Sequence, residues 1–214
     1  MKYLQNIDIA ADSREEILPD FSPDFPCLAS HVRLSRQLYP GAPWHWHRTV
    51  ELFYVESGSL EYIIPEGRFL FPPGSGGFLN ANVLHSSRIA DHSQPTVQLL
   101  HMFDPGFLAG ERGSRIERKY ILPLTAAGPR LLPLHPDDPA QAKILARLKE
   151  SFALPDGQWG YELRLRAVLS ELWLALFDLA RPAMESSSSA GHSDALIKAL
   201  MVYSHENYAR NLSV

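Results

Sequence analysis

Proline is distributed unevenly along this chain, and that distribution limits where helices can form. Of the 17 prolines, 15 precede residue 140, and only Pro155 and Pro182 follow it. Proline removes a backbone donor and is disfavoured in helix interiors, so it marks turns and breaks instead. The distribution therefore predicts strands and loops over the first two thirds of the chain and helices over the rest.

Short apolar stretches in the proline-rich part have the pattern of strands. Some alternate between apolar and polar residues, and others end at turn signals such as Gly58 and Gly67. Strands are expected at residues 28–38, 51–55, 60–64, 69–71, 78–79, 86–89 and 96–103. The third and fourth of these should form a hairpin. Many short strands at even spacing indicate a β-sandwich or barrel.

The pattern changes to a helical one after Asp138, which is a suitable N-cap before Pro139. A second, longer helix is expected over about residues 160–181. Its leucines recur at intervals of four and three residues, a spacing typical of paired helices. They are Leu165, Leu169, Leu172, Leu176 and Leu179. Two interpretations remain open: a seam between the two protomers of a homodimer, or a helix packed against its own barrel.

Composition limits the possible partners and the compartment. Formal net charge is -4, and the charges of residues 192–214 balance, so the residues that would read DNA are not expected in this sequence. The single cysteine, Cys27, fits a reducing compartment. The chain has neither a signal peptide nor the apolar run of about 18 residues that a membrane span needs. We therefore expect a cytoplasmic protein without membrane contact.

The residues with the clearest chemical potential are three histidines and a glutamate. His45 and His47 are two residues apart in an extended segment, so their side chains should point to the same side. Glu51 follows four residues later, and His85 is a fourth candidate. Such a set suits zinc, iron, nickel or manganese. Alternatively, the same side chains form hydrogen bonds inside a barrel and contact an organic effector.

The spacing of these residues resembles the two sequence motifs of cupins. Gly58 completes the pattern His-x-His-x3-Glu-x6-Gly that ends seven residues after Glu51. Residues 74–85 keep the spacing Gly-x5-Pro-x-Gly-x2-His, with Asn80 and Asn82 in place of the Pro and the second Gly. The resemblance implies a mainly β fold with C-terminal α structure: a cupin-type barrel (double-stranded β-helix or jelly-roll) followed by a helix pair.

The altered second motif points to a narrower family. Residues 78–86 (FLNANVLHS), with Trp46-His47 ahead of residues 51–55, resemble the barrel domain of AraC-type transcription regulators. The resemblance continues from about residue 28 to residues 200–208, which look like the first helix of that family's DNA-binding domain. It implies a barrel that binds a small effector, a helical dimerisation segment, a linker and a helix-turn-helix domain.

On this basis the chain divides into four parts. They are a cupin-like effector-binding barrel (1–137), a helical dimerisation segment (138–182), a serine-rich linker (183–192), and the first helix of a truncated AraC-type DNA-binding domain (193–214).

The implied protein is a regulator and not an enzyme. Its effector, and any divalent metal, would bind at His45, His47, Glu51 and His85, and DNA would be bound only by the missing C-terminal domain. The alternative is a metal-dependent cupin enzyme, a dioxygenase or an isomerase, using the same four residues. The serine-rich linker and a third helix, expected over about residues 193–208, favour the regulator, because such an enzyme needs neither.

Overall fold

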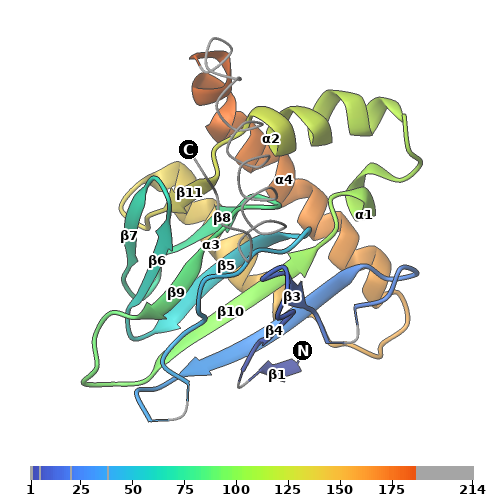
Figure 1. Cartoon of the computed structure of the whole chain (residues 1–214). Helices are drawn as coiled ribbons and strands as arrows, with labels where there is room; N and C mark the ends of the chain where they lie inside the picture. Colours follow the sequence, from blue (N-terminus) through green and yellow to red (C-terminus); the bar gives the residue numbers. More distant parts are fainter. Residues whose placement is uncertain (1, 5, 20, 38, 187–214) are drawn as a thin grey trace, which may run out of the picture.

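The computed structural model describes residues 2–4, 6–19, 21–37 and 39–186, and these form a β-barrel flanked by a layer of helices (Figure 1). The strands are β1 (Lys2–Leu4), β2 (Asp8–Ile9), β3 (Glu16–Ile17), β4 (Cys27–Leu34), β5 (Val50–Ser57), β6 (Leu60–Ile64), β7 (Gly67–Phe71), β8 (Gly76–Leu79), β9 (Ser86–Ile89), β10 (Thr96–Phe103) and β11 (Leu131–Leu134). The helices are α1 (Gly106–Ala109), the π-helix η1 (Glu117–Ile121), α2 (Leu122–Ala127), α3 (Pro139–Ser151) and α4 (Tyr161–Ser186).

Two sheets make the barrel. The larger has the order β1-β4-β10-β5-β8-β11, and the smaller has the order β7-β6-β9. Strand β10 pairs antiparallel with both β4 and β5, and β6 and β7 form the expected hairpin. All seven strands expected from the sequence are present, and the mainly β architecture with C-terminal helices is confirmed.

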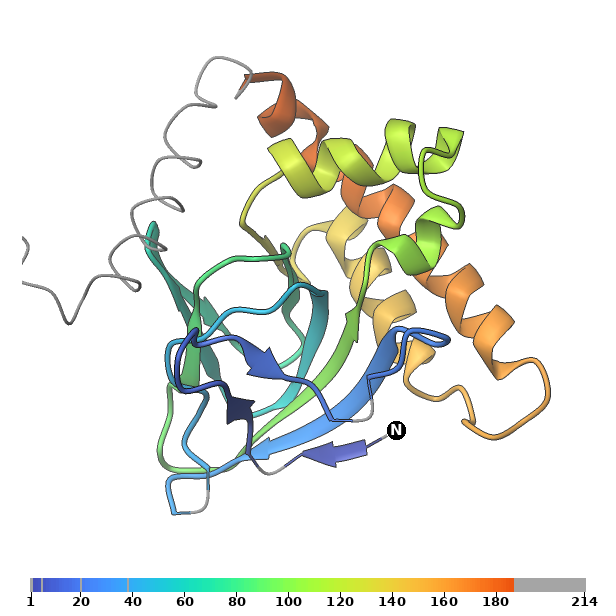
Figure 2. The ribbon, with the colours of Figure 1, turned by 45° about the vertical axis from the view of Figure 1, so that its right-hand side comes forward.

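One face of the larger sheet lines the barrel interior, and the other packs against the helices. Along β10, Leu100 and Met102 line the cavity inside the barrel, whereas Phe103 packs in the cluster formed with the helices. This alternation follows from the two-residue period of a strand. Because both faces are covered by apolar groups, the larger sheet is buried between the smaller sheet and the helices, which lie together on one side of the barrel (Figure 2).

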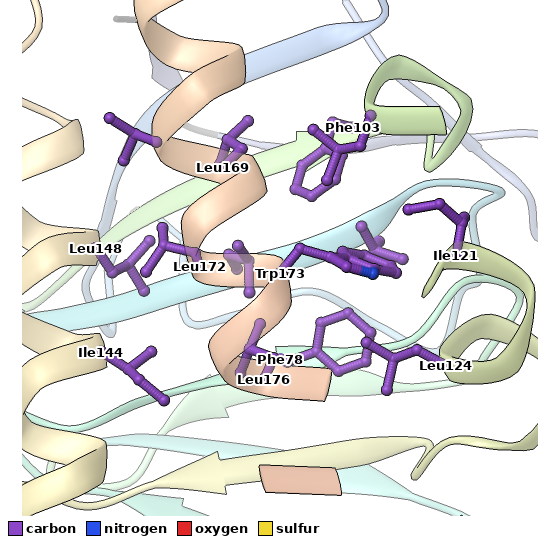
Figure 3. Close-up of a cluster of buried hydrophobic side chains, with 14 of the residues drawn as sticks. Phe78, Phe103, Ile121, Leu124, Ile144, Leu148, Leu169, Leu172, Trp173 and Leu176 are labelled. Carbon is purple, nitrogen blue, oxygen red and sulfur yellow. The ribbon is translucent and has the colours of Figure 1, made fainter. Parts of the chain in front are cut away.

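The centre of the helical layer is Trp173 on α4. Its ring lies edge-on to Phe78 of β8, with centroids 5.8 Å apart, and it also contacts Phe103 (Figure 3). Its indole N–H donates to the carbonyl oxygen of Tyr120 in η1 at 2.8 Å. Trp173 therefore ties α4 both to the barrel and to the segment that precedes α2.

The leucine stripe of α4 faces inward. Leu165, Leu169, Leu172 and Leu176 are each at most 2% exposed, and Leu179 packs partly buried against the same cluster. The structure thus supports the interpretation in which α4 packs against its own barrel. Four of these leucines are covered within the protomer and Leu179 is only partly buried, so a homodimer through this helix stays a prediction.

The prediction of strands and loops alone before residue 140 is wrong. Three helical segments occupy residues 106–127. Four strands were also not expected, namely β1, β2, β3 and β11. Pro105 is the N-cap of α1, where a missing N–H breaks no helical hydrogen bond, and Pro123 lies where the π-helix η1 continues into α2. Pro133 lies in β11, a strand at the edge of its sheet, where proline is tolerated.

The end of α4 also differs from expectation. The helix continues past Pro182 to Ser186, so the first residues of the expected linker are helical. The rest of that linker and the expected third helix lie outside the described residues. No helix in the described part of the chain is both long enough and apolar enough to cross a membrane.

The start of α3 gives a testable contribution to stability. The Asp138 carboxylate accepts the N–H groups of Ala140 (2.8 Å) and Gln141 (3.1 Å), as its predicted N-cap role requires. Asp138→Ala is expected to lower the free energy of unfolding by about 1 kcal/mol. Chemical denaturation measures the loss, and Asp137→Ala is the control because it removes a neighbouring exposed charge. An equal loss in both variants would contradict the capping role.

Candidate functional site

The three candidate histidines converge inside the barrel. The backbones of His45 and His85 pair as antiparallel neighbours, each N–H donating to the other's carbonyl oxygen at 2.9 Å. Their ring centroids are 4.1 Å apart, and that of His47 is 5.1 Å from His85. All three residues are buried, and one ring nitrogen of each lies within 4.8 Å of the other two.

Backbone carbonyl groups orient all three rings in the same way. The Nδ1 atom of His45 lies 2.7 Å from the Pro43 oxygen, and that of His85 lies 2.9 Å from the Val83 oxygen. His47 Nδ1 makes the equivalent contact with the Thr49 oxygen at 2.9 Å. An Nδ1–H that donates to a carbonyl group leaves Nε2 as the free ring nitrogen. Metal-binding histidines are typically held in this way.

Glu51 completes the set predicted from the sequence. Its Oε1 atom lies 3.1 Å from His47 Nε2 and 3.7 Å from His85 Nε2. Its Oε2 atom accepts the hydroxyl hydrogen of Tyr62 at 2.9 Å, and that hydroxyl accepts an N–H of Gln98 at 2.8 Å. Glu51 is thus held in one orientation by side chains from two further strands, β6 and β10.

A second carboxylate reaches the site from the N-terminal part of the chain. Glu16 of β3 is buried, and its Oε2 atom lies 3.7 Å from His45 Nε2. Sequence reasoning missed this residue, because nothing in the local sequence separates it from the neighbouring Glu15. Tyr62 and Gln98 were also missed, although each is a polar residue at an inward-facing position of its strand, which is a usable signal.

The carboxylates and imidazoles perturb one another. Burial raises the pKa of Glu16 to about 7, with His47 opposing the rise and Glu51 adding to it. Burial and the neighbouring His85 lower the pKa of His45 to about 3, so His45 is neutral at pH 7. Burial disfavours charge on His47 as well, but the hydrogen bond and charge of Glu51 outweigh it and raise the pKa of His47.

Glu51 is the fixed negative charge of the site. Burial alone would raise its pKa, but the contacts with His47 and His85 hold the pKa of Glu51 well below its usual range. The same carboxylate contributes, after burial, to a Tyr62 pKa well above its usual range, so the Tyr62 hydroxyl stays protonated. A buried, ionised carboxylate surrounded by imidazoles is an arrangement that favours a bound cation.

The loop before His85 joins the site to the helices. The Asn80 amide donates to the Leu124 oxygen of α2 at 3.0 Å, and the Asn82 N–H donates to the His47 oxygen at 2.8 Å. Asn82 has a φ of +59°, in the left-handed region, at the position where the cupin motif has glycine. Asparagine tolerates this conformation better than most residues. The replacement therefore keeps the turn that presents His85.

A small cavity adjoins these side chains. Its volume is about 40 Å³, and its walls include Glu16, His45, Glu51 and His85 together with apolar side chains. That volume suits a metal ion with a few water molecules, whereas pockets for drug-sized ligands measure roughly 300–1,000 Å³. In the conformation described, the cavity can therefore hold a metal ion and a few water molecules.

The residues present fit a divalent transition metal. Three imidazole nitrogens and a carboxylate form the mixed donor set that zinc, iron, nickel and manganese accept. The carbonyl contacts at every Nδ1 and the Tyr62 contact at Glu51 supply the outer support that such ligands need.

The remaining described histidines lie away from this cluster. His101 is on β10, a strand that also contributes side chains to the barrel interior. It faces the helices instead, with Nε2 2.7 Å from Ser151 Oγ and its ring stacked on Phe152 at 4.0 Å. Burial lowers the pKa of His101 to about 3, so it is a neutral packing residue.

Comparisons with known proteins concern the family and the fold of this chain. A family model described as the AraC-like ligand binding domain matches residues 32–201. A crystal structure of ToxT from Vibrio cholerae aligns with a TM-score of 0.51 at 14% identity, covering 87% of this chain and 67% of that chain. No curated protein matches this chain in sequence.

Two further solved structures align less well. ToxT from Vibrio cholerae with a bound unsaturated fatty acid gives a TM-score of 0.48 at 11% identity, covering 87% of this chain and 65% of that chain. An RmlC-like cupin from Shewanella frigidimarina gives 0.32 at 14% identity, covering 36% of this chain and 66% of that chain. At such identities the first ToxT alignment concerns the fold alone, a barrel with accompanying helices.

Proposed function

This chain belongs to the family of AraC-like ligand binding domains, and from that premise we propose that it is the effector-sensing part of a transcription regulator whose barrel binds a divalent transition metal. The observation that carries the proposal is the convergence of three buried imidazoles and Glu51 beside a cavity of about 40 Å³. A sensing domain needs an internal site where a ligand contacts several strands at once, and this cluster supplies one.

The metal would be held by Nε2 of His45, His47 and His85 and by the carboxylate of Glu51. When bound, it would supply positive charge and open coordination positions for an oxygen atom of a small effector. Tyr62 and Gln98 would keep Glu51 in its binding orientation, and the carbonyl contacts at Nδ1 would keep the three rings directed inward. The apolar wall formed by Leu100 and its neighbours would exclude water from one side.

Two connections from the site to the helices suit a sensing role. Glu51 alternates along β5 with Val50 and Leu52, which pack in the same cluster as α4. The Asn80 contact with α2 lies in the loop that presents His85. A change in the positions of Glu51 or His85 would therefore reach the helical layer through a single strand or a short loop. We propose that this layer relays the ligand state to a DNA-binding domain that follows the linker.

The family match favours a regulator over a metal-dependent cupin enzyme. It extends over residues 32–201 and so includes both α3 and α4, which lie beyond the barrel that cupin chemistry requires.

A reporter experiment tests the proposal. This chain would be joined to the DNA-binding domain of an AraC-type regulator with a known operator, and expression would be followed while zinc, iron, nickel or manganese is supplied or chelated. We expect expression to change several-fold with one of these metals. His85→Ala should abolish the response, because it removes one of three imidazole ligands, whereas His92→Ala, at an exposed loop position, should retain it.

A reporter that ignores every metal, or that responds equally well with His85→Ala, would contradict a metal-sensing barrel.

A further inference from the structure

The N-terminal hairpin formed by β2 and β3 lies against the segment that carries His45 and His47. Glu15 and Trp46 form a parallel bridge, and Glu16 lies next to that bridge. Several hydrogen bonds and one ion pair join the two segments. They are Glu16 N–H to Trp46 O (2.8 Å), Trp46 N–H to Arg14 O (3.1 Å), Trp46 Nε1–H to Ser13 O (2.8 Å) and Arg48 Nε to Glu15 Oε1 (2.9 Å).

Neighbouring carboxylates on this hairpin point in opposite directions. Glu15 pairs with the exposed side chain of Arg48, whereas Glu16 is buried and lines the cavity beside His45. The alternation of side chains along an extended segment produces this difference. Glu15 is therefore a natural control for Glu16, with the same chemical group and the same hairpin but no access to the cavity.

The contact between Glu16 and His45 is attractive only when a proton or a metal ion lies between the two atoms. His45 uses Nδ1 for the Pro43 carbonyl group, so Nε2 presents a lone pair toward Glu16 Oε2 at 3.7 Å. Two electron-rich atoms at this separation attract each other only through a shared proton or a metal ion. The separation is also wide enough for both atoms to be ligands of one ion at the usual bond lengths of about 2.0–2.2 Å.

We propose that Glu16 is a fifth ligand of the barrel metal, so that metal binding fastens the hairpin of residues 8–17 over the site. This inference rests on the proposed metal site of His45, His47, His85 and Glu51. It adds a ligand from outside the two cupin-like motifs and gives the metal a direct contact with a separate structural element. The five-ligand set would contain three nitrogen and two oxygen ligands, with both carboxylates neutralising the charge of a divalent ion.

Cobalt(II) is the probe, because its visible absorption reports the number and type of its ligands. The full chain, Glu16→Gln and Glu15→Gln would each be titrated with Co²⁺ in competition with a chelator. Glu16→Gln keeps the shape of the side chain but removes its charge. We expect it to weaken Co²⁺ binding by at least the roughly 10–100-fold that loss of a ligand's hydrogen-bond partner costs, and to alter the absorption spectrum. Glu15→Gln should keep both the affinity and the spectrum of the unaltered chain.

Hydrogen exchange followed by mass spectrometry gives a second measurement. In the unaltered chain, Co²⁺ should slow exchange at the backbone amides of residues 8–17. In Glu16→Gln, saturating Co²⁺ should leave that exchange unchanged while still slowing exchange around His47 and His85. A structural role for Glu16 without metal contact would not produce this dependence on the ion.

The outcomes distinguish this inference from the proposed function. If the unaltered chain binds no Co²⁺, the metal site itself is wrong and the inference falls with it. If the chain binds Co²⁺ and Glu16→Gln binds it equally well with the same spectrum, only the inference is overturned. Equal weakening by Glu15→Gln and Glu16→Gln would also overturn it, since hairpin docking and not ligation would then explain the loss.

Discussion

Replacing Leu172 and Leu176 together with glutamate is expected to unfold this protein. Both side chains are at most 2% exposed and pack in the cluster between α4, α3 and the barrel (Figure 3). Truncating a buried leucine alone costs about 2–5 kcal/mol, and burying a charge adds to that. The summed cost of two such changes matches or exceeds the free energy of unfolding of a typical domain, which is roughly 5–15 kcal/mol. Loss of the near-ultraviolet circular dichroism signal and of a cooperative thermal transition would show the unfolding.

The matched control uses two leucines on the outer side of the same helix. Leu163 and Leu174 are 74% and 51% exposed, so the double replacement Leu163→Glu and Leu174→Glu should change stability by only about 0.5 kcal/mol per site. If the Leu172 and Leu176 variant instead stays folded and only its oligomeric state changes in sedimentation, the leucines form an intermolecular seam and their packing within the protomer is contradicted.

Local signals in the sequence were sufficient for several elements of the fold. The hairpin of β6 and β7 was predictable because two apolar runs are separated only by Pro65 and Glu66, and the second run begins at Gly67. Strand β10 and the start of α3 at Asp138 were predictable for similar reasons: a β-rich apolar run in one case and an N-cap followed by proline in the other. Each of these signals depends on residues that are near in sequence.

The same local reasoning failed where proline has two uses. Proline predicts turns and breaks, but Pro105 caps the start of α1 and Pro123 lies where η1 continues into α2. The orientation of α4 was likewise undecided, because a leucine stripe has the same spacing whether it meets a second copy or the protomer's own sheet. Only the placement of Trp173 against Phe78 and Phe103 decides which side faces the barrel.

The site was predictable to the extent that it follows strand geometry. His45 and His47 share a side because extended backbone alternates, and Glu51 and His85 were placed by the spacing of the motifs. Glu16 was not predictable, since its arrival beside His45 depends on how a hairpin docks. That docking is fixed by contacts with Trp46 and Arg48, whose partners no local pattern identifies.

Binding of the metal is expected to stabilise the protein strongly, and His47→Ala should remove that stabilisation. At a free metal concentration one thousand times the Kd, binding to the folded state adds about 4 kcal/mol. For a chain of this size that corresponds to a rise in Tm of roughly 10 °C. Removal of the metal with a chelator should reverse the rise. The comparison is made within each variant, with and without metal, because His47→Ala also leaves the Glu51 carboxylate without its closest partner and lowers the stability of the metal-free protein.

A second variant, Glu51→Gln, tests the loss of a metal ligand with little change to the fold. Glu51→Gln is close in shape to the native residue and keeps the contact with the Tyr62 hydroxyl, but it removes the charged ligand. Thermal unfolding with and without Zn²⁺, followed by circular dichroism, should show the full rise in Tm for the unaltered chain and for His92→Ala. Little or no rise is expected for His47→Ala and Glu51→Gln. An undiminished rise in Tm in both variants would mean that the metal binds elsewhere. His47→Ala removes an imidazole ligand, and Glu51→Gln removes the carboxylate that contacts both His47 and His85. An ion at this site would lose affinity in either case.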